Sequence, residues 1–330
     1  MADYSIILPV LNGGKYVKEC INSILSQTIH GFNLIVLDSG STDGTTEWIQ
    51  SLNNSKISFY TSSKELSIED NWNRIKQIPR NEFMTIIGHD DLLFPNYLEE
   101  MDKLIKQNPD ASLYQAHFRF INQNGDLIRK CKPMKPIQYA DEFLLRQITE
   151  EFDSMGTGYM MRSRDFDAVG GMPNQYQKLI FADYELWIRL ILIKYKATTP
   201  VECFSYRIHS STSALTNGEE YQQAFFSYLE FLCSLKLTHP KIETVIKNKG
   251  KDFLLNFCQS LSHRLLKTPS VLRKTSVMEY IKKCNSYAEV LIPNQSFYPL
   301  LKPKILAAFL LDNKWGLKIF RIYKLILNQV

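Results

Sequence analysis

The chain has 330 residues, 45% of them hydrophobic, which is enough to bury the core of one large α/β domain with an appendage, or of two domains. Its net charge is only +5 and no recognisable motif interleaves aromatic with basic residues, so we expect no nucleic-acid partner. The six cysteines form no CxxC pair and no metal-type spacing, which favours reduced thiols in a cytosolic compartment over disulfides or a zinc site.

The first half of the chain alternates short apolar runs with stripes of helical period. Strands are predicted at YSIILPV (4–10), NLIVL (33–37) and FMTII (83–87), and helices at 16–25, at 45–52 and after Pro95, which suits a first helical turn. Continuous apolar strands alternating with amphipathic helices predict a mainly parallel sheet covered on both faces. Ligands of such sheets bind at the carboxyl ends of the strands, where Asp38 and the pair Asp90-Asp91 lie.

The adjacent carboxylates of Asp90 and Asp91 have two interpretations. Neighbouring carboxylates repel each other, so the pair suits a bound Mg²⁺ or Mn²⁺ together with substrate phosphates. The alternative is that the pair caps the following helix and offsets its dipole.

Basic residues concentrate toward the end of the chain. From Lys236 to Val330 there are 17 Lys or Arg against 5 Asp or Glu, whereas the first 235 residues hold 22 against 29. The polar segment SSTSALTNGEE separates the two compositions and reads as a loop. We therefore predict one domain over residues 1–215 and a mostly helical, basic region over residues 216–330.

The last helix predicted from the sequence, within NKWGLKIFRIYKLILNQV, spaces Lys314, Lys318 and Arg321 among apolar residues. This pattern is typical of an interfacial helix on anionic lipid, and a helix docked on the body or on another subunit is the alternative. The start, MADYSIILPV, has no signal-peptide pattern, and the apolar run ILAAFLL is shorter than the roughly 20 residues of a spanning helix. We expect a cytoplasmic protein, peripheral at the inner face of the cell membrane if this helix binds lipid.

Seven segments, which cover roughly residues 4–215, follow one another along the chain: SIILPVLNGGKYVKECINSILSQT, LIVLDSGSTDGT, NWNR, IIGHDDLL, TGYMMRSRDFDAVGGM, FADYELWIRL and SYRIHSSTSA. Their order resembles the family 2 glycosyltransferases with the GT-A fold, which implies that the domain over residues 1–215 is catalytic. The resemblance implies a Rossmann-like sheet flanked by helices. It also implies an inverting hexosyltransferase that moves a sugar from a nucleotide-diphosphate donor to an acceptor hydroxyl with Mn²⁺ or Mg²⁺.

The same resemblance assigns donor-binding residues. Pro9, Leu11 and Asn12 would cradle the base and ribose, and Asp38 would read the nucleobase or ribose unless it only stabilises its turn. Ser39 replaces a second acid that is frequent in the family, which leaves the base identity open. Polar residues on the helix of NWNR, Asn73 and Arg74, would approach the donor, with Arg74 contacting a phosphate or else lying in solvent.

In IIGHDDLL, Gly88 stands at the first acidic position of the family's metal motif, so one carboxylate is missing. Asp90 is the expected ligand, with Asp91 outside the coordination sphere or at a helix cap. His89 is expected to be an ordinary hydrogen-bonded residue, and metal ligation by His89 is the alternative. Metal binding should then depend more on the donor, because diphosphate oxygens must supply more of the coordination.

The resemblance places the general base in FADYELWIRL. Asp183 is the expected base, whereas Ala182 replaces a commoner Glu and Glu185, two residues further along the helix, should point elsewhere. An ordinary Asp is a weak base toward a sugar hydroxyl, so its pKa must be raised by burial or it must act late in the attack. The alternative is that Asp183 is only an acid in the first turn of a helix and has no catalytic role.

In SYRIHSS, Arg207 and His209 alternate with apolar residues and should face the same side. Their charge would offset that of the departing diphosphate, with His209 also a candidate metal ligand, and a purely structural pair is the alternative.

The whole pattern suggests a glycan or lipid-linked acceptor in bacterial surface-polysaccharide assembly (O-antigen, capsule or exopolysaccharide). A nucleotidyltransferase and a non-catalytic binding protein of the same fold are the alternatives. The sugar, nucleotide, acceptor and linkage are left open.

Overall fold

The computed structural model describes residues 4–209, 218–268 and 273–327, with side chains in the last segment described up to Phe320. The chain divides into two compact units. Unit 1 comprises residues 1–174 and 182–211, and unit 2 comprises residues 175–181 and 212–330. The second unit therefore includes a short segment that precedes the predicted boundary at residue 215.

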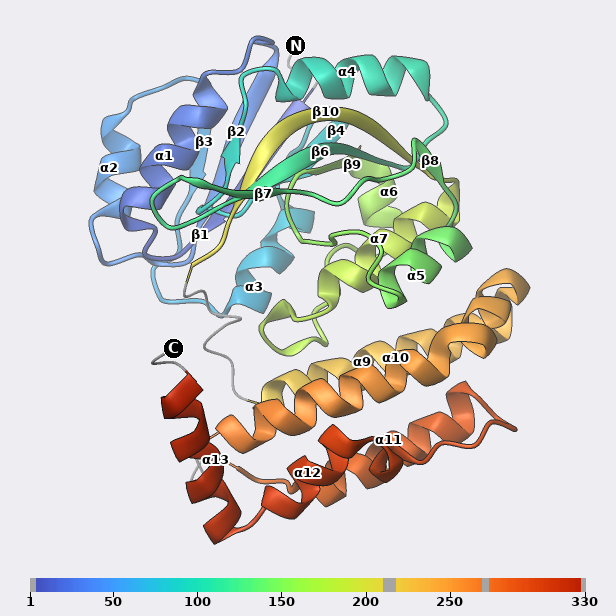
Figure 1. Cartoon of the computed structure of the whole chain (residues 1–330). Coiled ribbons are helices and arrows are strands. Elements are labelled where there is room, and N and C mark those ends of the chain that lie inside the picture. Colours follow the sequence, from blue (N-terminus) through green and yellow to red (C-terminus); the bar gives the residue numbers. More distant parts are fainter. Residues whose placement is uncertain (1–3, 210–217, 269–272, 328–330) are drawn as a thin grey trace. The chain divides into compact units, whose positions relative to one another are not determined.

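Unit 1 is built on one sheet with the strand order β3-β2-β1-β4-β9-β6-β10-β5, with β7 paired to β6 and β8 to β10 (Figure 1). The strands are β1 (Tyr4–Val10), β2 (Phe32–Asp38), β3 (Ile57–Tyr60), β4 (Phe83–Ile86), β5 (Leu92–Leu93), β6 (Leu113–Ile121), β7 (Leu127–Lys130), β8 (Ile137–Gln138), β9 (Tyr159–Arg162) and β10 (Lys196–Arg207). The three apolar runs predicted as strands form β1, β2 and β4, whose side chains are almost all buried.

The sheet is mixed, although a mainly parallel one was expected. Strand β1 pairs in parallel with β2 and β4, as predicted, and β3 and β10 also pair in parallel, with β2 and β6 respectively. Strand β9 runs antiparallel to both β4 and β6, and β5, β7 and β8 also pair in antiparallel fashion. The α/β class is thus confirmed, and β9 lies antiparallel between β4 and β6, so that β6 and β10 run in the same direction as β1 to β4.

Helices cover both faces of the sheet, with α4 and α7 on opposite sides (Figure 1). The helices of unit 1 are α1 (Gly14–Leu25), α2 (Thr45–Ser51), α3 (Ile68–Asn73), the 3₁₀ turn η1 (Arg74–Gln77), α4 (Tyr97–Gln107), α5 (Ala140–Ile148), α6 (Ser163–Ala168) and α7 (Ala182–Ile193). Helix α1 buries Val17, Cys20, Ile21 and Ile24, which is the stripe that its sequence predicts. Pro95 lies just ahead of α4, whose N-cap is Asn96, and not in the first turn.

Unit 2 is helical, as predicted for the basic region. It contains η2 (Gln177–Leu179), α9 (Gly218–Thr238), α10 (Pro240–Lys267), α11 (Val277–Leu291), η4 (Pro299–Leu301), α12 (Pro303–Leu311) and α13 (Lys314–Leu327). Its core holds stacked rings, with the centroids of Phe225 and Phe257 4.4 Å apart and those of Phe181 and Tyr228 5.7 Å apart. In the part of the chain that the structure describes, no helix combines the length and apolarity needed to cross a bilayer.

Candidate active site

The site is built at the carboxyl ends of the central parallel strands. Val10 at the end of β1 pairs with Asp38 at the end of β2, and the backbone N–H of Ile87 after β4 donates to the carbonyl of Ile7 in β1. The loop from Gly88 to Asp91 follows directly. Asp38 and the acid pair therefore lie at one edge of the sheet, as the sequence predicted.

Gly88 has no side chain, and the carboxylates of Asp90 and Asp91 occupy the space beside its α-carbon. A Cβ at this position would lie 2.8 Å from Asp90 Oδ1 and 3.2 Å from Asp91 Oδ2. The turn is closed by the N–H of Asp91, which donates to the Gly88 carbonyl at 3.1 Å. Any side chain at residue 88 would therefore require the carboxylates of Asp90 and Asp91 to move.

Asp91 is an internal anchor. Its carboxylate is buried and Oδ1 accepts a hydrogen bond of 2.8 Å from the backbone N–H of Arg207 at the end of β10. Burial raises the pKa of Asp91 well above its ordinary value, and the neighbouring charge of Asp90 raises it further. The capping alternative is wrong, because α4 starts beyond Asn96.

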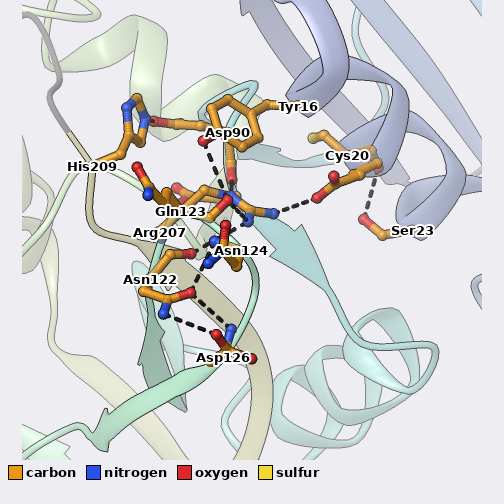
Figure 2. Close-up of polar contacts among 12 residues, drawn as sticks. Tyr16, Cys20, Ser23, Asp90, Asn122, Gln123, Asn124, Asp126, Arg207 and His209 are labelled. Carbon is orange, nitrogen blue, oxygen red and sulfur yellow. Dashed lines mark hydrogen bonds and ion pairs between the residues drawn. The ribbon is translucent and has the colours of Figure 1, made fainter.

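Asp90 and His209 form the pair that faces outward. Asp90 Oδ2 and His209 Nε2 are 2.7 Å apart, and both side chains are half-buried (Figure 2). The ring of Tyr16, from α1, lies with its centroid 5.1 Å from that of His209. The prediction that residues 207 and 209 face the same side is confirmed, since both contact Asp90.

Arg207 holds this pair in place. Its Nε donates to the Asp90 carbonyl at 2.7 Å, and its Nη2 forms an ion pair of 2.6 Å with Glu19 Oε2. Its Nη1 contacts the carbonyls of Asn122 and Gln123 at 3.4 Å each (Figure 2). Because the guanidinium is buried among protein oxygens, the structure favours the structural interpretation of Arg207 over a phosphate contact.

Tyr16 and Glu19 were missed at the sequence level. They lie three residues apart in the first turns of α1, where the sequence shows only an amphipathic stripe and polar residues. Arg207 lies 4.7 Å from the centroid of the Tyr16 ring, so both side chains of α1 meet the end of β10. The spacing of the motifs in the sequence does not indicate that the start of α1 and the end of β10 lie together.

Asp38 braces its own loop. Its carboxylate is fully buried, and Oδ2 accepts hydrogen bonds from Thr61 Oγ1 at 2.9 Å and from the N–H of Gly40 at 3.0 Å. Asn12 has a left-handed backbone (φ 51°); its N–H donates to Ser41 Oγ and its Oδ1 accepts from the N–H of Thr42, each at 2.8 Å. These contacts favour the turn-stabilising interpretation of Asp38.

The remaining predicted donor residues lie around the same loop. Arg74 donates from Nη1 to the Asp38 carbonyl and from Nη2 to the Tyr60 carbonyl, each at 2.8 Å, so its fork joins the ends of β2 and β3. Pro9 is buried within β1, and Leu11 and Asn73 are half-buried. Asn71, which the sequence did not single out, is buried and donates to the Leu37 carbonyl at 2.8 Å.

Asp183 occupies the first turn of α7, and its half-buried carboxylate accepts a hydrogen bond of 3.0 Å from the N–H of Tyr184. Burial raises its pKa from the ordinary 3.8 to about 6. Trp187 fixes the helix, since its buried ring stacks on Tyr159 at 4.2 Å and its Nε1 donates to the Met155 carbonyl at 2.9 Å. Glu185 is buried and paired with Arg189, as expected of a side chain that points elsewhere.

A short loop connects Asp183 with the acid pair. A Cβ at Gly156 would lie 3.9 Å from the Cβ of Asp183, and the next residue, Thr157, accepts a hydrogen bond of 3.0 Å from the N–H of Gly88. Gly156 leaves the space beside the Asp183 carboxylate open. The structure thus brings the expected base and the expected metal-binding loop to neighbouring positions.

The metal donors at the site are few. Among the residues that the structure describes, no group of three His, Cys, Asp or Glu side chains could hold a metal ion. Asp90 and His209 together offer one carboxylate oxygen and one imidazole nitrogen at an accessible position. This donor set fits a divalent ion that takes its other ligands from substrate phosphates and water.

Fold and site together define an α/β enzyme with its polar centre at the carboxyl edge of the sheet. The model of the family described as Glycosyl transferase family 2 matches residues 5–170, about half of the chain. The chain belongs to this family of sugar-transferring enzymes.

Individual proteins agree with this assignment. An uncharacterized glycosyltransferase of Rickettsia conorii is 28% identical over 262 residues, covering 76% of this chain but 40% of that protein, so the match spans less than half of the relative's length. The structure of S. aureus TarS 1-349 in complex with UDP-GlcNAc has a TM-score of 0.62 at 14% identity, covering 87% of this chain and 90% of that one. The mannosyltransferase PcManGT from Pyrobaculum calidifontis, in complex with GDP-Man and Mn²⁺, has a TM-score of 0.55 at 14% identity and covers 98% and 87%.

Proposed function

We propose that the chain transfers a sugar from a nucleotide-diphosphate donor to an acceptor hydroxyl, with inversion at the anomeric carbon. The observation that carries this proposal is Asp183, a half-buried carboxylate with a pKa of about 6, one loop away from the Asp90–His209 pair. A base with a pKa near the working pH is suited to accept a hydroxyl proton. The nucleotide-sugar complexes of TarS and PcManGT, which have a similar fold, support the donor class.

Each residue of the site has one role in the proposed transfer. The acceptor oxygen attacks the anomeric carbon, the bond from that carbon to the phosphate oxygen breaks, and the acceptor proton passes to the Asp183 carboxylate. Asp90 and His209 would hold a Mn²⁺ or Mg²⁺ ion, which would neutralise charge on the departing nucleoside diphosphate. Arg207 and Asp91 keep the segment that carries this pair in place, and the loop braced by Asp38, Asn12 and Arg74 would receive the nucleoside.

The domain assignment and the cellular role belong to the same proposal. We assign catalysis to the first predicted domain, and an acceptor-related role to the basic helical region. A glycan or lipid-linked acceptor of surface-polysaccharide assembly fits an enzyme that works in the cytoplasm at the inner face of the membrane. Helix α13 supports this location, since Lys314, Trp315, Lys318 and Ile319 are exposed while Phe320 is buried; Arg321 lies outside the described side chains.

Substitution of Asp183 tests the proposal. Asp183→Asn should lower turnover of a nucleotide sugar by about 10²- to 10⁴-fold while leaving the affinity for the nucleoside diphosphate with Mn²⁺ unchanged. Asp141→Asn is the matched control, because Asp141 is also an acid in the first turn of a helix, α5. Similar turnover in both variants would reduce Asp183 to a helix-terminal acid, and release of pyrophosphate in place of a nucleoside diphosphate would indicate a nucleotidyltransferase.

A further inference from the structure

Helix α12 is apolar on its outward face as well as on its packed face. Ile305 and Ala308 are buried, whereas the residues opposite them, at positions 303, 306, 307 and 310, are exposed and all apolar. Leu310 is 61% exposed, and Lys304 is the only charged residue in the helix. Because a helix that is apolar all round is normally covered, the outward face of α12 is expected to have a partner.

The neighbouring elements continue this face in sequence. Tyr298 and Leu301 are exposed at η4, just before α12, and Trp315 (77% exposed) and Ile319 are exposed one turn apart on α13, just after it. Helix α12 packs against both η4 and α13, and Phe320 and Gly316 provide the buried side of α13. We call the exposed set the η4–α13 surface: Tyr298, Leu301, Leu306, Leu310, Trp315 and Ile319. Such a concentration of exposed large apolar side chains marks an interaction site.

The charges around this surface have one sign. Residues 293–330 contain six Lys or Arg and a single acid, Asp312. Asp312 is turned inward, where it pairs with Arg273 and accepts a hydrogen bond of 2.6 Å from the N–H of Val277. Within the described side chains of this segment, the outward charges are therefore the four exposed lysines 302, 304, 314 and 318.

This combination favours an anionic lipid surface as the occupant. Apolar side chains lying between cations match a bilayer interface, where the rings and leucines enter the acyl boundary and the lysines meet phosphate groups. A second copy of the chain would bring a second set of the same lysines into the contact, because a two-fold contact joins identical patches. A nine-residue helix is about 14 Å long, so α12 can lie in the interface but cannot span it.

We propose that the η4–α13 surface is a membrane-binding surface that recognises anionic phospholipids through two consecutive interfacial helices. Helix α12, which the sequence suggested only as a run too short to cross a bilayer, contributes the larger uncharged part, and α13 contributes Trp315 beside Lys318, whose Nζ lies 5.3 Å from the ring centroid. The proposal deepens the function proposed above by naming its membrane partner. It rests on that function only for the reason why the protein would bind a membrane.

Vesicle flotation of the full chain tests the proposal. The chain should float with phosphatidylcholine vesicles that contain phosphatidylglycerol, and much less with phosphatidylcholine alone. Leu306→Glu/Leu310→Glu should weaken binding at least tenfold, because two apolar contacts are lost and two charges are added. Lys314→Gln/Lys318→Gln should weaken it by about fivefold per lysine, as should raised salt.

Leu237→Glu provides the matched control. Leu237 is 83% exposed near the end of α9, in the same unit but outside the η4–α13 surface, and its substitution should leave flotation unchanged. Circular dichroism and thermal melting confirm that each variant is folded. Undiminished flotation of the Leu306→Glu/Leu310→Glu variant, equal binding to both kinds of vesicle, or an equal loss in Leu237→Glu would each overturn the proposal.

Two further measurements separate this proposal from the transferase function. Sedimentation of the chain without lipid should show the same mass for wild type and the α12 variant, whereas a dimer that this variant dissociates would assign the surface to a second copy. Thermal stabilisation by UDP or GDP with Mn²⁺ should be the same in both proteins. A chain that floats but shows no donor-dependent turnover would refute the transferase function alone, and one that turns over donor but never floats would refute the membrane surface alone.

Discussion

Replacing Asp183 with asparagine should stabilise the protein at neutral pH while it removes activity. The surroundings of this carboxylate raise its pKa from 3.8 to about 6, so the folded chain binds the proton more tightly than the unfolded chain does. Stability is therefore lost as the pH rises from the unfolded value to the folded one, and the loss is complete above about pH 6. Asparagine keeps the oxygen that accepts from the N–H of Tyr184 and carries no charge.

The size of the effect follows from the same shift. The difference between a pKa of 3.8 and one of about 6 corresponds to about 3 kcal/mol of unfolding free energy at pH 7.5. This is an upper value because the side chain is half-buried and solvent screens part of its charge. At pH 5 the difference should fall to roughly half, because the native carboxyl is then mostly protonated. Urea unfolding of wild type, Asp183→Asn and Asp141→Asn at both pH values measures it. Equal stability of wild type and Asp183→Asn at pH 7.5 would refute the reasoning.

Three further predictions concern the site. Gly88→Ala should weaken Mn²⁺-dependent nucleotide binding by about 10²-fold, measured by titration calorimetry, because its Cβ would displace the carboxylate of Asp90; unchanged affinity would contradict this. Glu19→Ala should lower the free energy of unfolding by about 1–3 kcal/mol by leaving Arg207 without its carboxylate, whereas Glu19→Gln keeps an acceptor and should recover part of the loss. The rate at subsaturating donor should fall about tenfold per unit below pH 6 as Asp183 protonates, and a flat profile down to pH 4 would exclude it as the base.

The sequence predicted strands β1, β2 and β4 and the location of the site because both depend on local patterns. Runs such as NLIVL can only be buried, and the polar residues that follow them must then lie at the carboxyl edge of the sheet. Strand β9 was not predicted as a strand. Its four buried residues, YMMR, are too few for a periodic signal, and its antiparallel direction depends on pairing with β4 and β6, which are distant in the sequence.

The functions of individual polar side chains were harder to predict, because they depend on contacts between distant segments. Whether Arg207 contacts a substrate or the protein depends on Glu19, 188 positions away, and on the carbonyls of the turn after β6. The burial of Asp91 likewise depends on the backbone N–H of Arg207, which no residue pattern reveals. Asp183 was easier to place, since the apolar anchors of α7 are neighbours in sequence.

The segment at residues 175–181 has a consequence for any attempt to separate the two units. Phe181 packs with Phe225, Tyr228 and Phe257 of the second unit, and Lys178, Leu179 and Phe181 all have positive φ angles, which non-glycine residues adopt only when surrounding contacts hold them. A fragment ending at residue 215 would keep this strained stretch but lose the side chains that hold it. The stretch ends at Phe181, two residues before Asp183. A fragment that contains the first unit should therefore keep the helices that pack on Phe181, or its segment 175–181 should be redesigned.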